Sequence, residues 1–166
     1  MSVAGASVSK ALVAAWDDAG LDAKFKALWA GEVSADEFIV LHDQEASPQQ
    51  PWPYCVLEQI SASTTSRMSG GVSHLREIRD VDIRFHVHAS EVSGDSRTAK
   101  EIAAYLCEEI MKVFGGHPTE APSALTLDHG KFLIAQYQSD YGVRTGDETY
   151  EWLVHYIFRI DVPVAV

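Results

Sequence analysis

The sequence predicts an α+β fold, a two-layer sandwich in which about four mostly antiparallel strands pack against two amphipathic helices. Two patterns indicate this fold. Apolar residues alternate at period two near the C-terminus, and in two other segments they recur at three- and four-residue spacing. The expected order is helix, strand, strand, helix, strand, strand. A chain of 166 residues has the usual size of one domain, so we expect 1–166 to form a single α+β domain.

The first helix is expected over residues 8–30, with a kink or break at Gly20 and a cap at Ser7 or Ser9. The second helix is expected over residues 96–114. It follows a polar SGDS run, keeps one apolar face at helical spacing, and stops at a pair of glycines.

Four strands are expected over residues 54–63, 75–89, 131–138 and 149–162. The proline-rich stretch 42–53 is expected to be a loop, because it has no apolar periodicity. The small, polar stretch 64–74 is expected to be a long flexible loop at a hairpin tip, and 115–130 is expected to be irregular.

The last strand carries the strongest pattern in the chain. Seven apolar residues alternate without interruption: Tyr150, Trp152, Val154, Tyr156, Phe158, Ile160 and Val162. Such alternation predicts a strand with one buried face. The other face mixes charged residues with Leu153 and Ile157, and we expect it to meet water or a neighbouring subunit.

Composition excludes several classes of protein. The net charge of −11 and the scattered basic residues argue against a protein that coats DNA. No stretch approaches the roughly 18 apolar residues of a membrane span. Cys55 and Cys107 lie far apart without a CxxC partner, so we expect no disulfide framework and two small buried side chains.

His86 and His88 form the most suggestive pair for chemistry. Two residues apart in a strand, they share a face and could meet one metal ion, with Asp82 on the same face. The same alternation points both histidines outward simply because Phe85 and Val87 point inward. The chain has no GxSxG motif, phosphate-binding loop or dinucleotide fingerprint. We therefore expect no catalytic residues, no bound metal and no cofactor.

Four segments carry a resemblance to a known family. A proline-rich approach leads into the strand PWPYCVLEQI, and a polar loop precedes REIRDVDIRFHVHAS. The helix SRTAKEIAAYLCEEIMKVF follows directly, and the alternating strand YEWLVHYIFRIDVPV comes almost last. In this layout the chain resembles the tail-terminator, or tail-completion, proteins of tailed bacteriophages and prophages, which are minor tail proteins of the head–tail joining group.

The resemblance implies a structural, non-enzymatic role in the virion. Such proteins form a ring, typically a homohexamer, on the head-proximal end of the tail tube. The implied partners are further copies of the chain, the tail tube protein and the head connector protein, with assembly in the host bacterial cytoplasm. DNA would pass through the ring without specific binding, which agrees with the acidic charge of the chain.

A ring needs two different complementary patches on each subunit. One candidate patch is the 64–74 loop, and the other is the face of the last strand. The candidate interface residues are Trp52, Arg67, Met68, Leu153, His155 and Ile157. Trp52 stands between two prolines, where it either packs back onto the domain or anchors a partner.

Three alternatives remain open at this point. The first is a head-completion or neck protein of the same pathway, which would bind a different partner but show the same physical features in its sequence. A metal-dependent hydrolase or lyase would be built around His86 and His88. A ligand-binding adaptor without a phage connection is the third.

Overall fold

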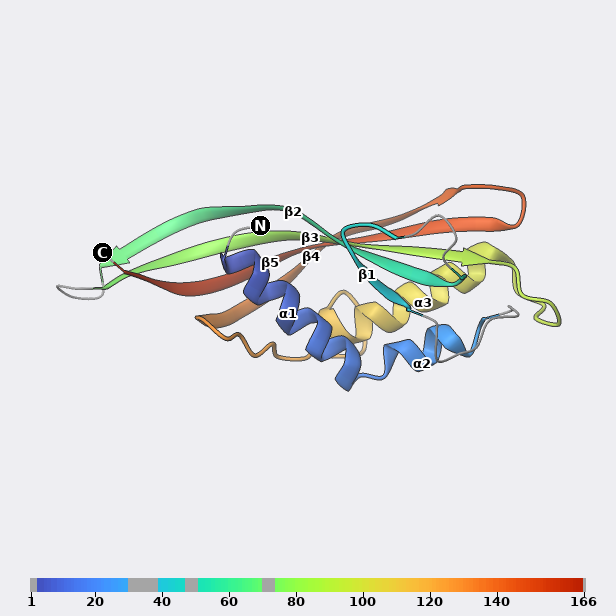
Figure 1. Ribbon diagram of the computed structural model, residues 1–166, viewed down its shortest axis with the longest axis horizontal. Coiled ribbons are helices and arrows are strands. Elements are labelled where there is room, and N and C mark those ends of the chain that lie inside the picture. The colour runs from blue at the N-terminus through green and yellow to red at the C-terminus, as the bar shows by residue number, and fades with distance from the viewer. Residues whose placement is uncertain (1–2, 30–38, 47–50, 70–73, 166) are drawn as a thin grey trace.

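The computed structural model describes residues 3–29, 39–46, 51–69 and 74–165. The described helices are α1 (Val3–Asp18), α2 (Leu21–Lys26) and α3 (Ala99–Phe114). The described strands are β1 (Leu41–Asp43), β2 (Tyr54–Ser69), β3 (His74–Ser90), β4 (Lys131–Arg144) and β5 (Thr149–Ala165). They form one sheet in the order β1-β2-β3-β5-β4 (Figure 1).

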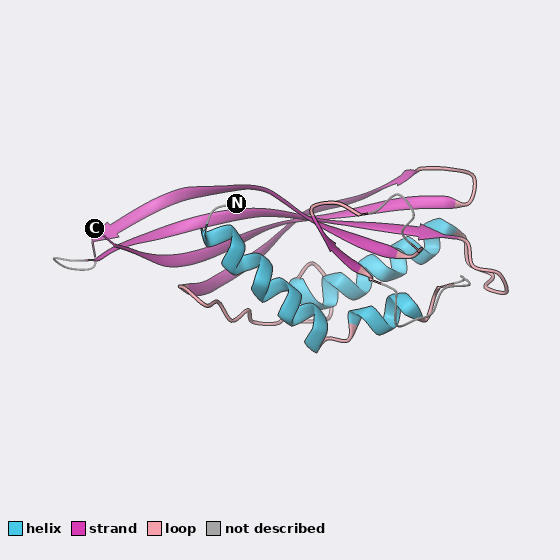
Figure 2. Ribbon diagram, in the orientation of Figure 1, coloured by secondary structure: helices cyan, strands magenta, loops and turns pink. Residues whose placement is uncertain are grey.

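The two-layer α+β architecture predicted from the sequence is confirmed, with five described strands where about four were expected. β1 runs parallel to β2, and every other neighbouring pair is antiparallel. All three described helices lie on one face of the sheet, and none of the described helices covers the opposite face (Figure 2). None of the described helices has the length and apolar character needed to cross a membrane.

An aromatic cluster fills the space between the sheet and the helices. Phe85 of β3 is fully buried and stacks on Phe114 of α3, with ring centroids 5.0 Å apart. Trp16 of α1 and Tyr156 of β5 contact the Phe85 ring at centroid distances of 6.2 and 6.0 Å. One side chain therefore joins two helices and two neighbouring strands. Cys55 and Cys107 are buried free thiols, as the sequence predicted.

The first helical segment is broken at Gly20, as its position predicted. Gly20 has a φ of 66°, which favours glycine because it lacks a Cβ atom. The predicted bounds of 8–30 were wrong at both ends, because α1 begins at Val3 and α2 ends at Lys26. Ser7 and Ser9 therefore lie inside α1 and do not cap it.

The predicted start of α3 at residue 96 was also wrong. The helix begins at Ala99, and Thr98 is its N-cap. The Thr98 hydroxyl accepts from the Glu101 amide, while the Glu101 carboxylate accepts from the Thr98 amide at 2.7 Å. This capping box supplies hydrogen-bond partners for two amides at the helix start. The helix therefore begins after Thr98 and not within the SGDS run.

The strands are longer than the sequence predicted. β2 continues through residues 64–69 and β3 begins at His74, so the predicted 64–74 loop was wrong at those residues, and residues 70–73 lie outside the described residues. β4 runs on to Arg144, and β5 runs on to Ala165. Within 42–53, predicted to be a loop, residues 42–43 belong to β1 and pair with β2. Residues 115–130 are irregular, as expected.

Three strands continue past the helical layer toward the C-terminus (Figure 1). We call this part the arm, made of residues 64–69, 74–79 and 160–165. Backbone pairing and ion pairs hold the arm together. Glu77 is buried there between Arg79 at 2.7 Å and Arg67 at 3.1 Å. The arm therefore explains why 64–69 has no apolar periodicity even though it is a strand.

Candidate assembly surface

The face of the sheet without helices is the surface on which the predicted residues gather, and we call it the bare face. The alternation of side chains along β3 and β5 determines which residues point to this face. Val81, Ile83, Phe85 and Val87 point to the core, as do Val154, Tyr156, Phe158 and Ile160. The residues between them in sequence therefore point to the bare face. The outward placement of His86 and His88 agrees with the sequence prediction.

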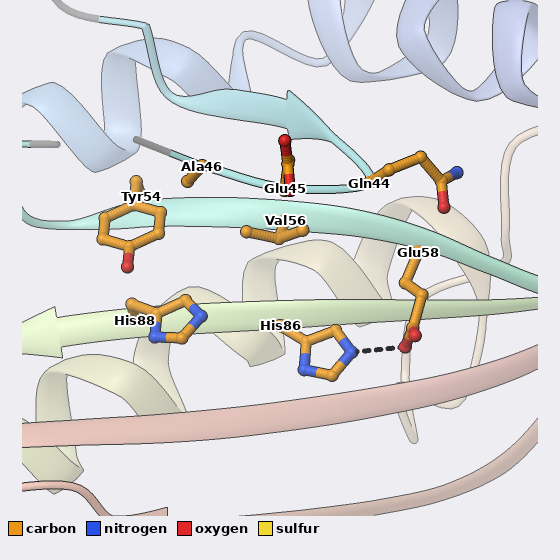
Figure 3. Close-up of a pocket in the computed structure, with 8 residues that line it drawn as sticks. All are labelled: Gln44, Glu45, Ala46, Tyr54, Val56, Glu58, His86 and His88. Atoms are coloured by element: carbon orange, nitrogen blue, oxygen red, sulfur yellow. Dashed lines mark hydrogen bonds and ion pairs between the residues drawn. The ribbon is translucent and has the colours of Figure 1, made fainter. Parts of the chain in front are cut away.

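His86 lies between two carboxylates from neighbouring strands. Its Nδ1 is 2.7 Å from Glu151 on β5, and its Nε2 is 2.8 Å from Glu58 on β2 (Figure 3 shows the Glu58 contact). An ionised carboxylate only accepts hydrogen bonds, so both ring nitrogens donate, which requires the imidazolium form. Neither nitrogen keeps a lone pair for a metal ion or for proton abstraction.

The surroundings of His86 shift its pKa upward. Burial lowers the pKa, but the hydrogen bonds to Glu151 and Glu58 outweigh this effect. The opposite holds for His88, whose pKa is lowered by burial. Two histidines that sequence reasoning paired as possible metal ligands therefore sit in different electrostatic environments.

His88 belongs to an aromatic stack at one end of the bare face. Its ring lies over Tyr54 at 4.5 Å between centroids, and the Trp52 ring meets His88 edge-on at 5.8 Å. Trp52 thus packs back onto its own domain, which is the first of the two placements that the sequence left open. A hollow of about 280 Å³ lies beside this stack (Figure 3). It is lined by Gln44, Glu45, Ala46, Tyr54, Val56, Glu58, His86 and His88.

Ion pairs between strands continue along the bare face. Arg159 of β5 donates to Asp80 of β3 at 2.8 and 2.9 Å, and Arg76 of β3 donates to Asp161 of β5 at 3.1 and 2.5 Å. His155 is hydrogen-bonded to Asp82. Within the described residues no group of three or more His, Cys, Asp or Glu side chains is arranged to hold a metal ion. Most of the charged groups on this face are therefore paired with one another, whereas the buried Nε of Arg84 has no hydrogen-bond partner among the described residues.

The six candidate interface residues fall into two groups. Leu153, His155 and Ile157 lie together on the bare face, and Trp52 packs near the end of that face. Arg67 lies on the arm in an ion pair with Glu77, while the side chain of Met68 lies outside the described residues. Leu153 is only 5% exposed, so its neighbours in the sheet already cover the apolar area expected there. The interface role of all six stays a prediction.

Sequence reasoning missed the apolar strip along β4. Five large side chains there are between 37% and 52% exposed, namely Leu133, Ile134, Tyr137, Tyr141 and Val143. The available signal was the run KFLIAQYQSDYGV, which has apolar residues on both faces of an extended chain. Because the predicted strand ended at residue 138, the second half of the strip was not expected.

The pairing of His86 predicts how stability depends on pH. A pKa raised above the ordinary 6.5 means that the folded state favours the proton, so this stabilisation is complete below pH 6.5. It is lost as the pH rises through the folded-state pKa. We expect the free energy of unfolding, measured with urea, to fall as the pH rises above 6.5.

His86→Gln should remove this loss above pH 6.5. The control is His88→Gln, which should keep it, because the lowered pKa of His88 acts in the opposite direction and below pH 6.5. A His86→Gln protein that loses stability over the same range as the unsubstituted chain would show that the two carboxylates do not hold the proton.

Comparison with known proteins shows a distant structural likeness. No family model and no curated protein sequence matches the chain. A chain of a solved structure described as "Virion of native gene transfer agent (GTA) particle" is similar over 74% of this chain and 78% of its own length. The identity is 16% and the TM-score is 0.40, values too low to assign a family or a function.

Proposed function

We propose that this protein is a structural component of a phage-like particle, a tail terminator that caps the head-proximal end of the tail tube and joins it to the head. It acts as a ring of identical subunits, with six as the expected number. The resemblance in layout to tail-terminator proteins supports this proposal. It spans nearly the whole chain from residue 8 onward.

The observation that carries the proposal is the bare face. In an enzyme, reactive groups are usually left available in a cleft. Here His86 is held by two carboxylates, and Arg159 is paired with Asp80 across strands. A broad face on which most charged groups are already paired suits a building block that works through its surfaces.

The charge of the chain supports passage of DNA without adhesion. Each subunit carries a net charge of −11. Phosphates are held by clustered, unpaired Lys and Arg side chains. Arg76 and Arg159 are instead neutralised by Asp161 and Asp80. A channel lined by such a surface would not trap the genome during ejection.

Deletion of the gene from its phage or prophage tests the proposal. We expect negative-stain images to show tail tubes of uncontrolled, excessive length without attached heads, and we expect the gene supplied in trans to restore the normal length. Tails of normal length beside unattached heads would instead indicate a head-completion or neck protein. Complete, infectious particles in the absence of the gene would contradict any virion role.

A further inference from the structure

The sheet has two open edges on opposite sides. β4 is the last strand in the order, so its outer edge has no partner strand within the described part of the chain. At the other side, β1 pairs only with residues 55–57 of β2. Residues 58–69 of β2 are therefore open along their outer edge, again within the described residues.

Both edges carry few of the side chains with which proteins usually protect an open strand: Lys131 and Arg144 stand at the two ends of β4, and Arg67 stands near the end of β2. Lysines and prolines are the common devices. Residues 58–66 contain no proline and only one charge, at Glu58. Residues 132–143 contain no proline and only Asp140, whose carboxylate accepts hydrogen bonds from Tyr137 and from Trp152. In a chain with net charge −11, the two edges are thus unusually poor in charge.

The directions of the strands allow these edges to meet. β2, β3, β5 and β4 are successively antiparallel, so β4 runs opposite to β2. When two copies lie side by side in the same orientation, β4 of one copy faces β2 of the next as an antiparallel neighbour. The antiparallel pair is the slightly more stable kind.

The two edges also bend at the same heights. The pairing register shifts at Ile60 and Thr65 in β2, and at Leu133 and Gln138 in β4. The pairing partners across β3 and β5 show how far along the sheet each shift lies. The shifts at Ile60 and Gln138 both fall next to Tyr156 of β5, within one residue of each other. The other two shifts lie together near Ile160. Bulges bend a strand, so the two edges follow the same curve.

Exposed apolar side chains flank both edges at these bends. Leu133 and Ile60 are each 42% exposed, and each stands at a register shift. Ile134, 48% exposed, stands next to Leu133. Pairing of the edges would bury these three side chains together with the open backbone groups, and both gains favour association.

We propose that β4 of one copy pairs with residues 58–69 of β2 in the next copy, so that a single sheet continues across the subunit boundary. The inference rests on the proposed ring and specifies the contact that builds it. A second copy is the occupant because one chain supplies both edges, with matching direction, matching bends and little charge. Such a contact is head-to-tail, the kind that closes into rings.

Disulfide trapping tests the pairing. Ser63 pairs with Asp80 of β3, Asp80 pairs with Arg159 of β5, and Arg159 pairs with Ile134. Ser63 and Ile134 therefore lie at the same height in the sheet and point to the same face. Ser63→Cys is combined in turn with Ile134→Cys, Gln136→Cys, Ser139→Cys or Tyr141→Cys, four positions that share that face and test different registers. Under mild oxidation we expect at least one pair to give a ladder of linked subunits, because Cα atoms in paired strands lie within the roughly 7 Å that a disulfide requires.

Matched controls separate pairing from random collision. Each single cysteine variant should form no ladder, and neither should Ser63→Cys with Ala135→Cys, because Ala135 points to the opposite face. The native Cys55 and Cys107 are buried and do not compete. Ile134→Lys should raise the concentration needed for half-assembly by about tenfold, while the exposed helical control Val13→Lys should leave it unchanged.

Light scattering on the unsubstituted chain distinguishes failure of this inference from failure of the proposed function. Rings that form with no ladder from any pair would overturn the edge contact and leave the terminator role intact. If the chain is monomeric in solution, the cysteine pairs are oxidised on particles that contain it. No ladder there would also overturn the inference.

Discussion

Phe85→Ala is expected to lower the free energy of unfolding by about 3–5 kcal/mol. Phe85 is fully buried, and its ring contacts Phe114, Trp16 and Tyr156. These side chains belong to different layers, so the surrounding structure cannot collapse into the cavity without moving a helix relative to the sheet. Urea unfolding followed by tryptophan fluorescence measures the loss.

Tyr105→Ala is the matched control for an aromatic side chain outside this cluster. Tyr105 lies on α3, is 36% exposed, and meets Arg97 at 5.4 Å from the ring centroid. We expect its removal to cost about 1 kcal/mol or less. If Phe85→Ala cost no more than Tyr105→Ala, the aromatic cluster would not be the centre of the core.

Gly130→Ala is expected to cost about 3 kcal/mol, from backbone strain together with a steric clash. Gly130 directly precedes β4 and has a φ of 101°, which L side chains rarely adopt. A Cβ atom at this position would lie 2.5 Å from the carbonyl oxygen of Asp161 in β5. That oxygen belongs to backbone in the sheet and cannot move aside cheaply, so the start of β4 should loosen from β5.

Gly94→Ala separates the two causes. Gly94 also has a positive φ, of 85°, but a Cβ atom there would meet nothing within 4 Å. Only the backbone strain of the positive φ applies here, and we expect the free energy of unfolding to fall by about 1–2 kcal/mol. Equal losses for the two variants in urea unfolding would show that β4 and β5 do not approach closely at Gly130. Hydrogen exchange should place the extra loss of protection in the first half of β4.

The sequence predicted those elements whose side chains face the core. β5 shows seven alternating apolar residues because the helices cover that side of it for most of its length. Residues 64–69 showed no such signal, because their own side chains are nearly all polar on both faces and they pair with β3 through backbone groups. β1 has only three residues, too few for any period, and it exists because Leu41–Asp43 pair with residues 55–57.

The bare face was predicted in outline and not in its contacts. Alternation in β3 was enough to turn His86 outward. Its partners Glu58 and Glu151 lie 28 and 65 residues away in the chain, and only the register of three strands brings them together. Register depends on packing between distant segments, which a pattern within one segment does not contain. For the same reason the spacing of His86 and His88 predicts a shared face but not the two carboxylates that hold His86 or the aromatic rings that contact His88.

The division between the arm and the rest of the domain has a consequence for how this protein can evolve. Core positions such as Phe85 accept few replacements, because neighbouring volumes must still fit. Most side chains of residues 64–67 project into solvent and have no volume to match. Apart from Arg67, which pairs with the buried Glu77, substitutions there can accumulate at little cost to stability, so the arm can acquire specificity for a new docking partner while the rest of the domain stays unchanged.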